Sequence, residues 1–151
     1  MKMSDQILDV DLLAFESGSE ATRRAVVDGV RRSLATGFVY TSTDISEDLL
    51  DSAYGMLVEF FSKDQETKTS CIAPGAHGQT GYTGLLVEMA ASSDKPDWKE
   101  MLNWASPIAA GHPLKRKFPG SYPEQLLPDA VVPGISQVLY AFHDAIAEIQ
   151  K

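Results

Sequence analysis

The stretch Gly78-Gln-Thr-Gly-Tyr82-Thr-Gly-Leu-Leu-Val-Glu88, which continues through Asp94-Lys-Pro-Asp97-Trp-Lys-Glu100-Met-Leu-Asn-Trp104, decides the fold of this chain. It begins with glycines beside an aromatic residue, continues as a short β-rich segment and reaches a turn marked by proline. The pattern predicts a strand from Gly81 to Val87 and a further short element from Trp98 to Trp104. The glycines do not predict a phosphate-binding loop, because no Lys-Ser/Thr pair follows them and no helix opens at once.

Before this stretch the sequence predicts strands and amphipathic helices in alternation. Ile7 to Leu13 alternates apolar residues with aspartates over too few positions for a helix, and it predicts a short half-buried strand. Ser17-Gly-Ser-Glu20 has the pattern of a capping box, which predicts the start of a helix. Gly37 supplies the C-terminal stop of that helix, and residues 37–41 predict a second strand. The apolar residues of the helix recur at helical spacing: Val26, Val27, Val30 and Leu34.

Two further helices are predicted, one on each side of the opening stretch. Ser46 is the expected N-cap of the first, because acidic residues that favour a helix N-terminus follow it. Its expected buried face consists of Leu50, Ala53, Tyr54, Leu57 and Phe61. Residues 107–133 predict a long connection, which is uncommon unless it packs on another part of the protein or has a function. The last helix has an apolar stripe of Ile135, Val138, Leu139, Phe142, Ala145, Ile146 and Ile149.

The end of the chain carries a separate expectation. Gln150-Lys151 follows the last helix without a glycine, a proline or a turn signal. We therefore expect this helix to be cut in mid-course, so that its apolar stripe is buried by material that these residues do not encode. The alternative is a short natural tail that frays into solvent.

Composition limits the classes of function. The chain has 151 residues, a formal net charge of −8 and an isoelectric point near 4.7, which indicates one acidic domain and no nucleic-acid partner. The basic cluster Lys115-Arg-Lys117 is typical of a solvated loop. The single cysteine, Cys71, excludes an internal disulfide and favours a reducing cytoplasm. No signal peptide or run of membrane-spanning length is present, so we expect a cytoplasmic protein with no membrane partner.

The succession of elements resembles a known family. A strand, a helix, the strand Gly37-Phe-Val-Tyr40, a helix ending in Phe60-Phe61 with Lys68 after it, and Gly81-Tyr82 come in order, followed by acidic and aromatic positions and a long helix. This order is similar to that of the N-terminal region of iron(II)- and 2-oxoglutarate-dependent dioxygenases of the isopenicillin N synthase-like family. The resemblance implies an α+β fold in which a helical and strand region, residues 1–132, packs on a jelly-roll barrel (double-stranded β-helix). It also implies that residues 133–151 begin the long helix leading to that barrel, which is largely absent from this chain.

The resemblance implies Fe(II) and 2-oxoglutarate as cofactors of the complete enzyme. Such enzymes hold iron with two histidines and one carboxylate, and two of these ligands come as His-X-Asp/Glu. Here His77, His112 and His143 each lack an acid two residues later, so the metal triad is absent from this chain. Arg32-Ser33 is not the family's 2-oxoglutarate-binding pair, since it lies on an amphipathic helix well before any barrel. We expect the chain alone to bind neither cofactor.

The candidate substrate-binding residues are Tyr82, Glu88, Gln79 and Thr83. Tyr82 matches the Gly-Tyr strand that can face substrate in the family, and the alternative is a structural aromatic residue packed on the second helix. Gln79 and Thr83 could line the same pocket or belong to an ordinary polar loop. Glu88 matches an acidic position of the family, whereas Glu100 is expected to be a structural hydrogen-bonding group.

Two hypotheses of different class follow. In the first, the chain is the N-terminal part of a non-haem iron oxygenase that acts on a small molecule. It then supports the barrel, forms one wall of the substrate pocket and is inactive alone. In the second, it is a non-catalytic domain that binds a protein partner through residues 135–149.

Overall fold

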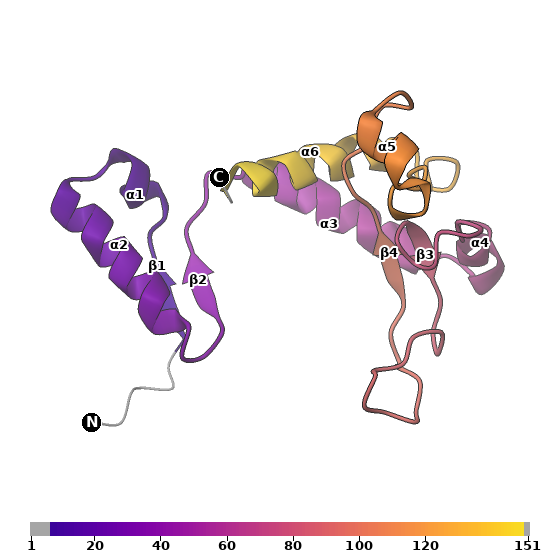
Figure 1. The fold of residues 1–151 in the computed structure, drawn as a ribbon, viewed down its shortest axis with the longest axis horizontal. Helices are drawn as coiled ribbons and strands as arrows, with labels where there is room; N and C mark the ends of the chain where they lie inside the picture. The colour runs from indigo at the N-terminus through magenta and orange to yellow at the C-terminus, as the bar shows by residue number, and fades with distance from the viewer. Residues whose placement is uncertain (1–6, 150–151) are drawn as a thin grey trace. The chain divides into compact units, whose positions relative to one another are not determined.

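The computed structural model describes residues 7–149, which separate into two compact units (Figure 1). The first unit comprises the residues up to Ile45, and the second begins at Ser46. Across the described residues the fold is a mixture of helices and two small sheets, with no closed barrel. The expected α+β class is therefore confirmed for this part of the chain.

The first unit is a two-stranded parallel sheet joined by helices. It contains the strand β1 (Leu8–Val10), the helices α1 (Leu13–Ser17) and α2 (Glu20–Ser33), and the strand β2 (Val39–Thr41). Leu8 pairs with Val39 and Val10 with Thr41 in parallel register. Gly29 lets α2 approach β1 closely, because a methyl group at this position would lie 2.9 Å from a methyl carbon of Val10. This contact covers one face of β1.

Three details of the first unit differ from the sequence predictions. The first strand ends at Val10, and Leu13 instead begins α1, where Asp11 Oδ1 accepts the Ala14 amide at 3.2 Å. The predicted capping box at Ser17-Gly-Ser-Glu20 is wrong, because Ser19 is the N-cap of α2 and Glu20 its first residue. Of the four predicted stripe residues only Val26 is buried; the others are exposed at 40% to 77%: Val27, Val30 and Leu34.

In the second unit, the long helices α3 (Glu47–Phe61) and α6 (Ile135–Ile149) lie side by side (Figure 1). The predicted cap of α3 is confirmed, since the Ser46 hydroxyl accepts the Leu49 amide at 3.2 Å. The predicted face of α3 is correct at Ala53 and wrong at Tyr54, which is 62% exposed. The face is rotated toward Phe60, which is completely buried. Ile135 and Leu139 of α6 are also completely buried, so the N-terminal half of the predicted stripe packs within this unit.

The remaining elements of the second unit are short. They are the helix α4 (Gln65–Thr69), the strands β3 (Gly81–Thr83) and β4 (Met101–Asn103), the helix α5 (Pro113–Lys117) and the 3-10 helix η1 (Pro119–Ser121). The two strands pair antiparallel, with Tyr82 opposite Leu102. The strand predicted to reach Val87 ends at Thr83, because Leu86 takes a left-handed conformation with φ of 62° that interrupts a regular ladder. The connection predicted over 107–133 contains α5 and η1 and is tied to the unit where Thr80 Oγ1 accepts the Leu126 amide at 2.9 Å.

Some sequence predictions concern residues or boundaries that these units do not test. The interrupted end of the last helix was predicted from Gln150 and Lys151, which lie outside the described residues. The boundary predicted between residues 132 and 133 does not separate the two units, since α6 packs against α3 within the second unit. Whether it is a domain boundary in a larger enzyme stays a prediction. Among residues 7–149 no helix has both the length and the apolar character needed to cross a membrane.

Candidate functional site

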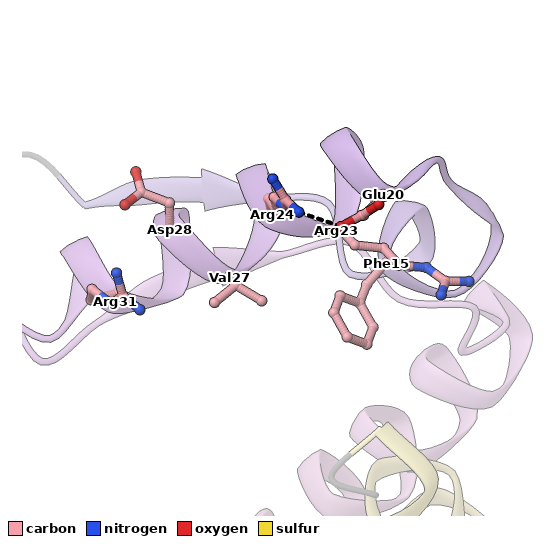
Figure 2. Close-up of a pocket in the computed structure, with 7 residues that line it drawn as sticks. All are labelled: Phe15, Glu20, Arg23, Arg24, Val27, Asp28 and Arg31. Carbon is pink, nitrogen blue, oxygen red and sulfur yellow. Dashed lines mark hydrogen bonds and ion pairs between the residues drawn. The ribbon is translucent and has the colours of Figure 1, made fainter.

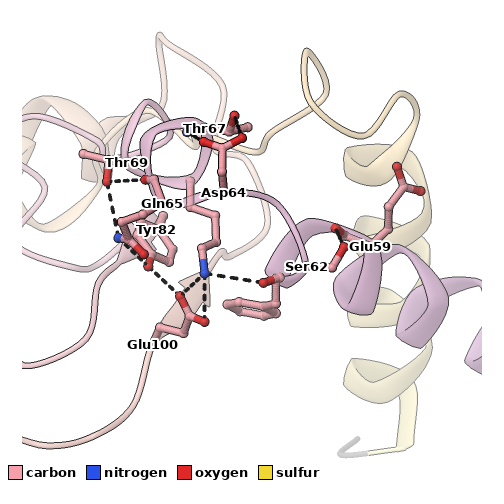
Figure 3. A network of polar contacts seen from close by, with 10 residues as sticks. Glu59, Ser62, Asp64, Gln65, Thr67, Thr69, Tyr82 and Glu100 are labelled. Carbon is pink, nitrogen blue, oxygen red and sulfur yellow. Dashed lines mark hydrogen bonds and ion pairs between the residues drawn. The ribbon is translucent and has the colours of Figure 1, made fainter.

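A largely buried polar network ties β3 and Glu100, the residue before β4, to α4 (Figure 3). Lys68 Nζ donates to both carboxylate oxygens of Glu100, at 2.8 and 3.0 Å, and to the Phe61 carbonyl oxygen at 3.4 Å. The Tyr82 hydroxyl donates to Glu100 Oε2 at 2.5 Å and accepts from Gln65 Nε2 at 3.2 Å. The side chain of Lys68 is only 9% exposed and Tyr82 only 2%, so these groups are shielded from water.

Local sequence explains how α4 presents its two polar residues. Asp64 is the N-cap of α4 and accepts the Thr67 amide at 2.8 Å, which fixes the first turn. Gln65 and Lys68 are three residues apart, so they lie on the same face of the helix. On β3, the Tyr82 ring also packs edge-on against Phe60 with centroids 5.9 Å apart. This contact with α3 agrees with the alternative stated from the sequence, in which Tyr82 is a structural aromatic residue packed on a helix.

The network shifts the ionisation of its members. Burial alone would raise the pKa of Glu100, but the hydrogen bonds from Lys68 and Tyr82 outweigh it and hold that pKa below its ordinary value. The hydrogen bond to Glu100 raises the pKa of Lys68 against the opposing effect of burial. Burial, followed by the hydrogen bond to Glu100, raises the pKa of Tyr82. At neutral pH the network therefore contains an ion pair with a neutral phenol beside it.

Polar atoms also gather on the other face of β3, beside Gly78. Successive strand residues point to opposite faces, so the seating of Tyr82 in the network directs Thr83 away from it. A methyl group on Gly78 would lie 3.4 Å from Thr83 Oγ1 and 3.9 Å from Glu88 Oε1. Asn103 holds the Gly78 carbonyl oxygen with a 2.8 Å hydrogen bond. We call this group of neighbouring residues, Gly78, Thr83 and Glu88, the Gly78 niche.

Lys99 forms ion pairs with Glu88 and with Asp97. Its Nζ lies 2.9 Å from Glu88 Oε2 and 3.1 Å from Asp97 Oδ2. The backbone amide of Leu86 donates to the Asp97 carbonyl at 3.0 Å, and the Asp97 amide to the Glu88 carbonyl at 2.7 Å. The hydrogen bonds to Glu88 and then to Asp97 raise the pKa of Lys99. Two carboxylates around one ammonium leave this group with a net charge of −1.

The four predicted substrate residues do not form one cluster. Thr83 and Glu88 come together at the Gly78 niche, Gln79 is exposed, and Tyr82 faces the buried network on the other side of the strand. The prediction that Glu100 is a structural hydrogen-bonding group is confirmed. The substrate contacts expected for the four predicted residues stay predictions.

Sequence reasoning missed Lys68 and Gln65 as members of the network. A signal was available, because a carboxylate expected to be buried, such as Glu100, requires a cationic or hydrogen-bonding partner. His77 is exposed and has a φ of 48°. Among residues 7–149 no group of three or more His, Cys, Asp and Glu side chains is arranged to hold a metal ion.

The first unit carries a separate surface hollow of about 440 Å³ (Figure 2). Its lining consists of Phe15, Glu20, Arg23, Arg24, Val27, Asp28 and Arg31. Arg24 pairs with Glu20, and Arg23 donates to a backbone carbonyl at 3.0 Å. Three arginines and two acids give this lining a net charge of +1, and we assign no ligand to the hollow.

Comparison with known proteins places the fold. The sequence matches the family described as non-haem dioxygenase in morphine synthesis N-terminal over residues 7–129. No curated protein matches the chain. A structure assigned to the 2OG-Fe(II) oxygenase family from Caulobacter crescentus is similar, with a TM-score of 0.71 and 20% identity over 97% of this chain and 46% of that chain. A full-length Neurospora crassa protein in complex with alpha-KG and thymine has a TM-score of 0.68 and 18% identity over 95% and 45%. The chain thus spans about half the length of both proteins.

Proposed function

The chain belongs to the family of non-haem dioxygenase N-terminal domains, and on that premise we propose that it is the N-terminal part of an iron(II)- and 2-oxoglutarate-dependent oxygenase of a small molecule. Its role is to support the catalytic barrel and to form one wall of the substrate pocket. In this proposal residues 1–132 are the supporting region, and residues 133–151 begin the helix that leads to the barrel.

The observation that carries the proposal is the incomplete sheet of the first unit. Parallel strands occur almost only in larger sheets that are covered on both faces, and two strands alone are marginal in water. Within residues 7–149, β1 and β2 pair only with each other. Phe38 and Tyr40 beside and within β2 are 70% and 63% exposed. Further strands of a barrel would complete the hydrogen bonding of this sheet and bury these rings.

The cofactors belong to the complete enzyme in this proposal. When bound, iron(II) and 2-oxoglutarate supply the oxidising chemistry that breaks a substrate C–H bond. The residues of this chain that we place toward substrate are Thr83 and Glu88, which come together beside Gly78, and the exposed Gln79. Tyr82 acts on the same wall indirectly, since its buried hydroxyl is held by Glu100 and its seating directs Thr83 outward.

The reading frame that follows Lys151 provides the simplest test. We expect it to encode a His-X-Asp motif and a later histidine within a barrel. A stop codon at that point would favour the non-catalytic alternative. That alternative gains little from the geometry, because Ile135 and Leu139 of the α6 stripe are already buried in the second unit.

A spectroscopic test addresses the chain itself. Iron(II) and 2-oxoglutarate give a weak visible charge-transfer band only when both chelate in a formed site. We expect residues 1–151 to give no such band under anaerobic conditions. A band that saturates at one iron per chain would overturn the assignment of the metal site to the rest of the enzyme.

A further inference from the structure

We propose that residues 84–99, the segment between β3 and β4, form a docking arm whose apolar side chains are covered by the catalytic barrel of the same polypeptide. We call these residues the arm. The inference rests on the proposed function and deepens it, since it names the surface through which this chain holds the barrel. It is argued from the exposure of the arm, from the bonds that brace it, and from the size of the surface.

The arm carries a concentration of exposed apolar side chains. Figure 1 shows this segment extending away from the helices of the second unit. Five large apolar residues of the arm are exposed, at 41% to 81%: Leu85, Leu86, Val87, Met89 and Trp98. Trp98 is the most exposed large apolar side chain among residues 7–149. Single exposed apolar residues are ordinary on a protein surface, whereas a group of them on one short segment is typical of an interaction site.

Bonds between the two sides of the arm brace it without using these side chains. The Leu86 amide donates to the Asp97 carbonyl at 3.0 Å, and the Asp97 amide donates to the Glu88 carbonyl at 2.7 Å. The ion pairs of Lys99 with Glu88 and Asp97 join the same two sides. At the base of the arm, Glu100 belongs to the largely buried polar network.

The backbone of Leu86 is strained. Its φ of 62° is uncommon for a residue other than glycine, and such a conformation persists only where the surrounding structure fixes it. Leu86 is nevertheless 46% exposed, so burial of its own side chain within the second unit does not account for the strain. The arm therefore presents its apolar side chains to solvent on a hydrogen-bonded backbone.

The size of this surface decides between two occupants. An exposed apolar patch of this kind covers on the order of 300–600 Å². Two copies of the chain paired through it would bury roughly 600–1,200 Å² in total, at or below the lower limit of about 1,200 Å² for stable complexes of separate proteins. Interfaces between domains of one polypeptide begin at about 600 Å², and the covalent connection gives them a high effective concentration. The arm therefore fits a contact within one polypeptide better than a contact between two copies.

Both similar structures contain enough additional chain to provide such a contact. The present chain covers 46% of the Caulobacter crescentus protein and 45% of the Neurospora crassa protein, so more than half of each lies outside the region of similarity. Under the proposed function, the corresponding part of this protein is the barrel. Because Glu88, Asp97 and Lys99 are already paired with one another, the surface that the arm offers to the barrel is chiefly apolar.

Trp98 reports directly on whether the arm is covered. Acrylamide quenching of fluorescence is measured for residues 1–151 and for the longer protein encoded by the natural reading frame. The contribution of Trp98 is the difference between each protein and its Trp98→Phe variant. We expect strong quenching of Trp98 in residues 1–151 and a several-fold decrease in the longer protein, because a side chain at the centre of an interface loses nearly all of its 81% exposure.

Two outcomes of the quenching experiment would overturn the proposal. Equal quenching of Trp98 in the two proteins would show that the barrel does not cover the arm. Protection of Trp98 in residues 1–151 that increases with protein concentration would identify a second copy of the chain as the occupant.

A matched pair of variants tests whether the contact is specific to the arm. Val87→Ser should lower the midpoint temperature of thermal unfolding of the longer protein by about 2–4 °C and leave that of residues 1–151 unchanged, since the valine is buried only where the barrel covers it. Val58→Ser on α3 is the control, because Val58 lies outside the arm and has the same exposure as Val87, 68%. An equal loss with both variants in the longer protein, or an equal loss with Val87→Ser in residues 1–151, would refute the arm as the contact.

The arm and the proposed function fail in different ways. A longer protein that carries the iron-binding motif but leaves Trp98 exposed would refute the arm and retain the oxygenase assignment. A stop codon after Lys151 would refute the proposed function and, with it, the barrel as the occupant.

Discussion

Replacing Lys68 by methionine should destabilise the second unit by about 2–4 kcal/mol. Methionine keeps most of the aliphatic stem of Lys68 but removes the ammonium group and its hydrogen bonds to both oxygens of Glu100. Removal of one partner of a buried ion pair typically costs about 3–5 kcal/mol, because the other charge is left without compensation. Glu100 is 23% exposed and keeps the Tyr82 hydroxyl as a donor, so water and this bond recover part of the loss.

Urea unfolding followed by tryptophan fluorescence measures this effect in the relevant unit, since Trp98 and Trp104 both belong to it. Lys63→Met is the matched control, because Lys63 pairs with Glu59 at 2.9 Å but its side chain is 32% exposed. Exposed pairs of this kind contribute about 0–1 kcal/mol. A double variant that also replaces Glu100 by methionine should cost less than the sum of the single changes. Equal destabilisation by Lys68→Met and Lys63→Met would refute the reasoning.

Three further predictions concern single groups in the second unit. Because the folded pKa of Glu100 is lowered from 4.5, its contribution is present above this pH and is lost as pH falls through the folded pKa. The free energy of unfolding measured in urea should therefore fall more steeply below pH 4.5 in the native chain than in Glu100→Gln. Parallel pH profiles of the two proteins would contradict this. Gly81→Ala should cost more in thermal unfolding than Gly75→Ala: both have positive φ, but only at Gly81 would the added methyl lie 2.7 Å from a backbone carbonyl oxygen. Equal costs would contradict that clash. Thr80→Val should cost about 1–3 kcal/mol in urea, because it leaves the Leu126 amide without its acceptor, and a neutral effect would show that water replaces the hydroxyl.

The sequence predicted the local features of the fold well because neighbouring residues determine them. The Ser46 cap depends on a hydroxyl and an amide three residues away, and Gly37 takes the positive φ, 75°, that a helix stop requires. The rotation of α3 toward Phe60 was missed, because the buried side of a helix is chosen by what packs against it. Here Phe60 packs against Tyr82, which lies beyond the helix in sequence.

The candidate site shows the same division. The sequence by itself named Thr83 and Glu88 as candidates through a family resemblance, and it determined that Glu100 needs a partner. Only the tertiary structure decided that this partner is Lys68, which lies 32 residues away along the chain. It also decided that Tyr82 and Thr83 serve opposite faces of one strand. Spacing in the sequence predicts contacts within one turn or one helix. The pairing of charges that are far apart in the sequence depends on how strands and helices pack.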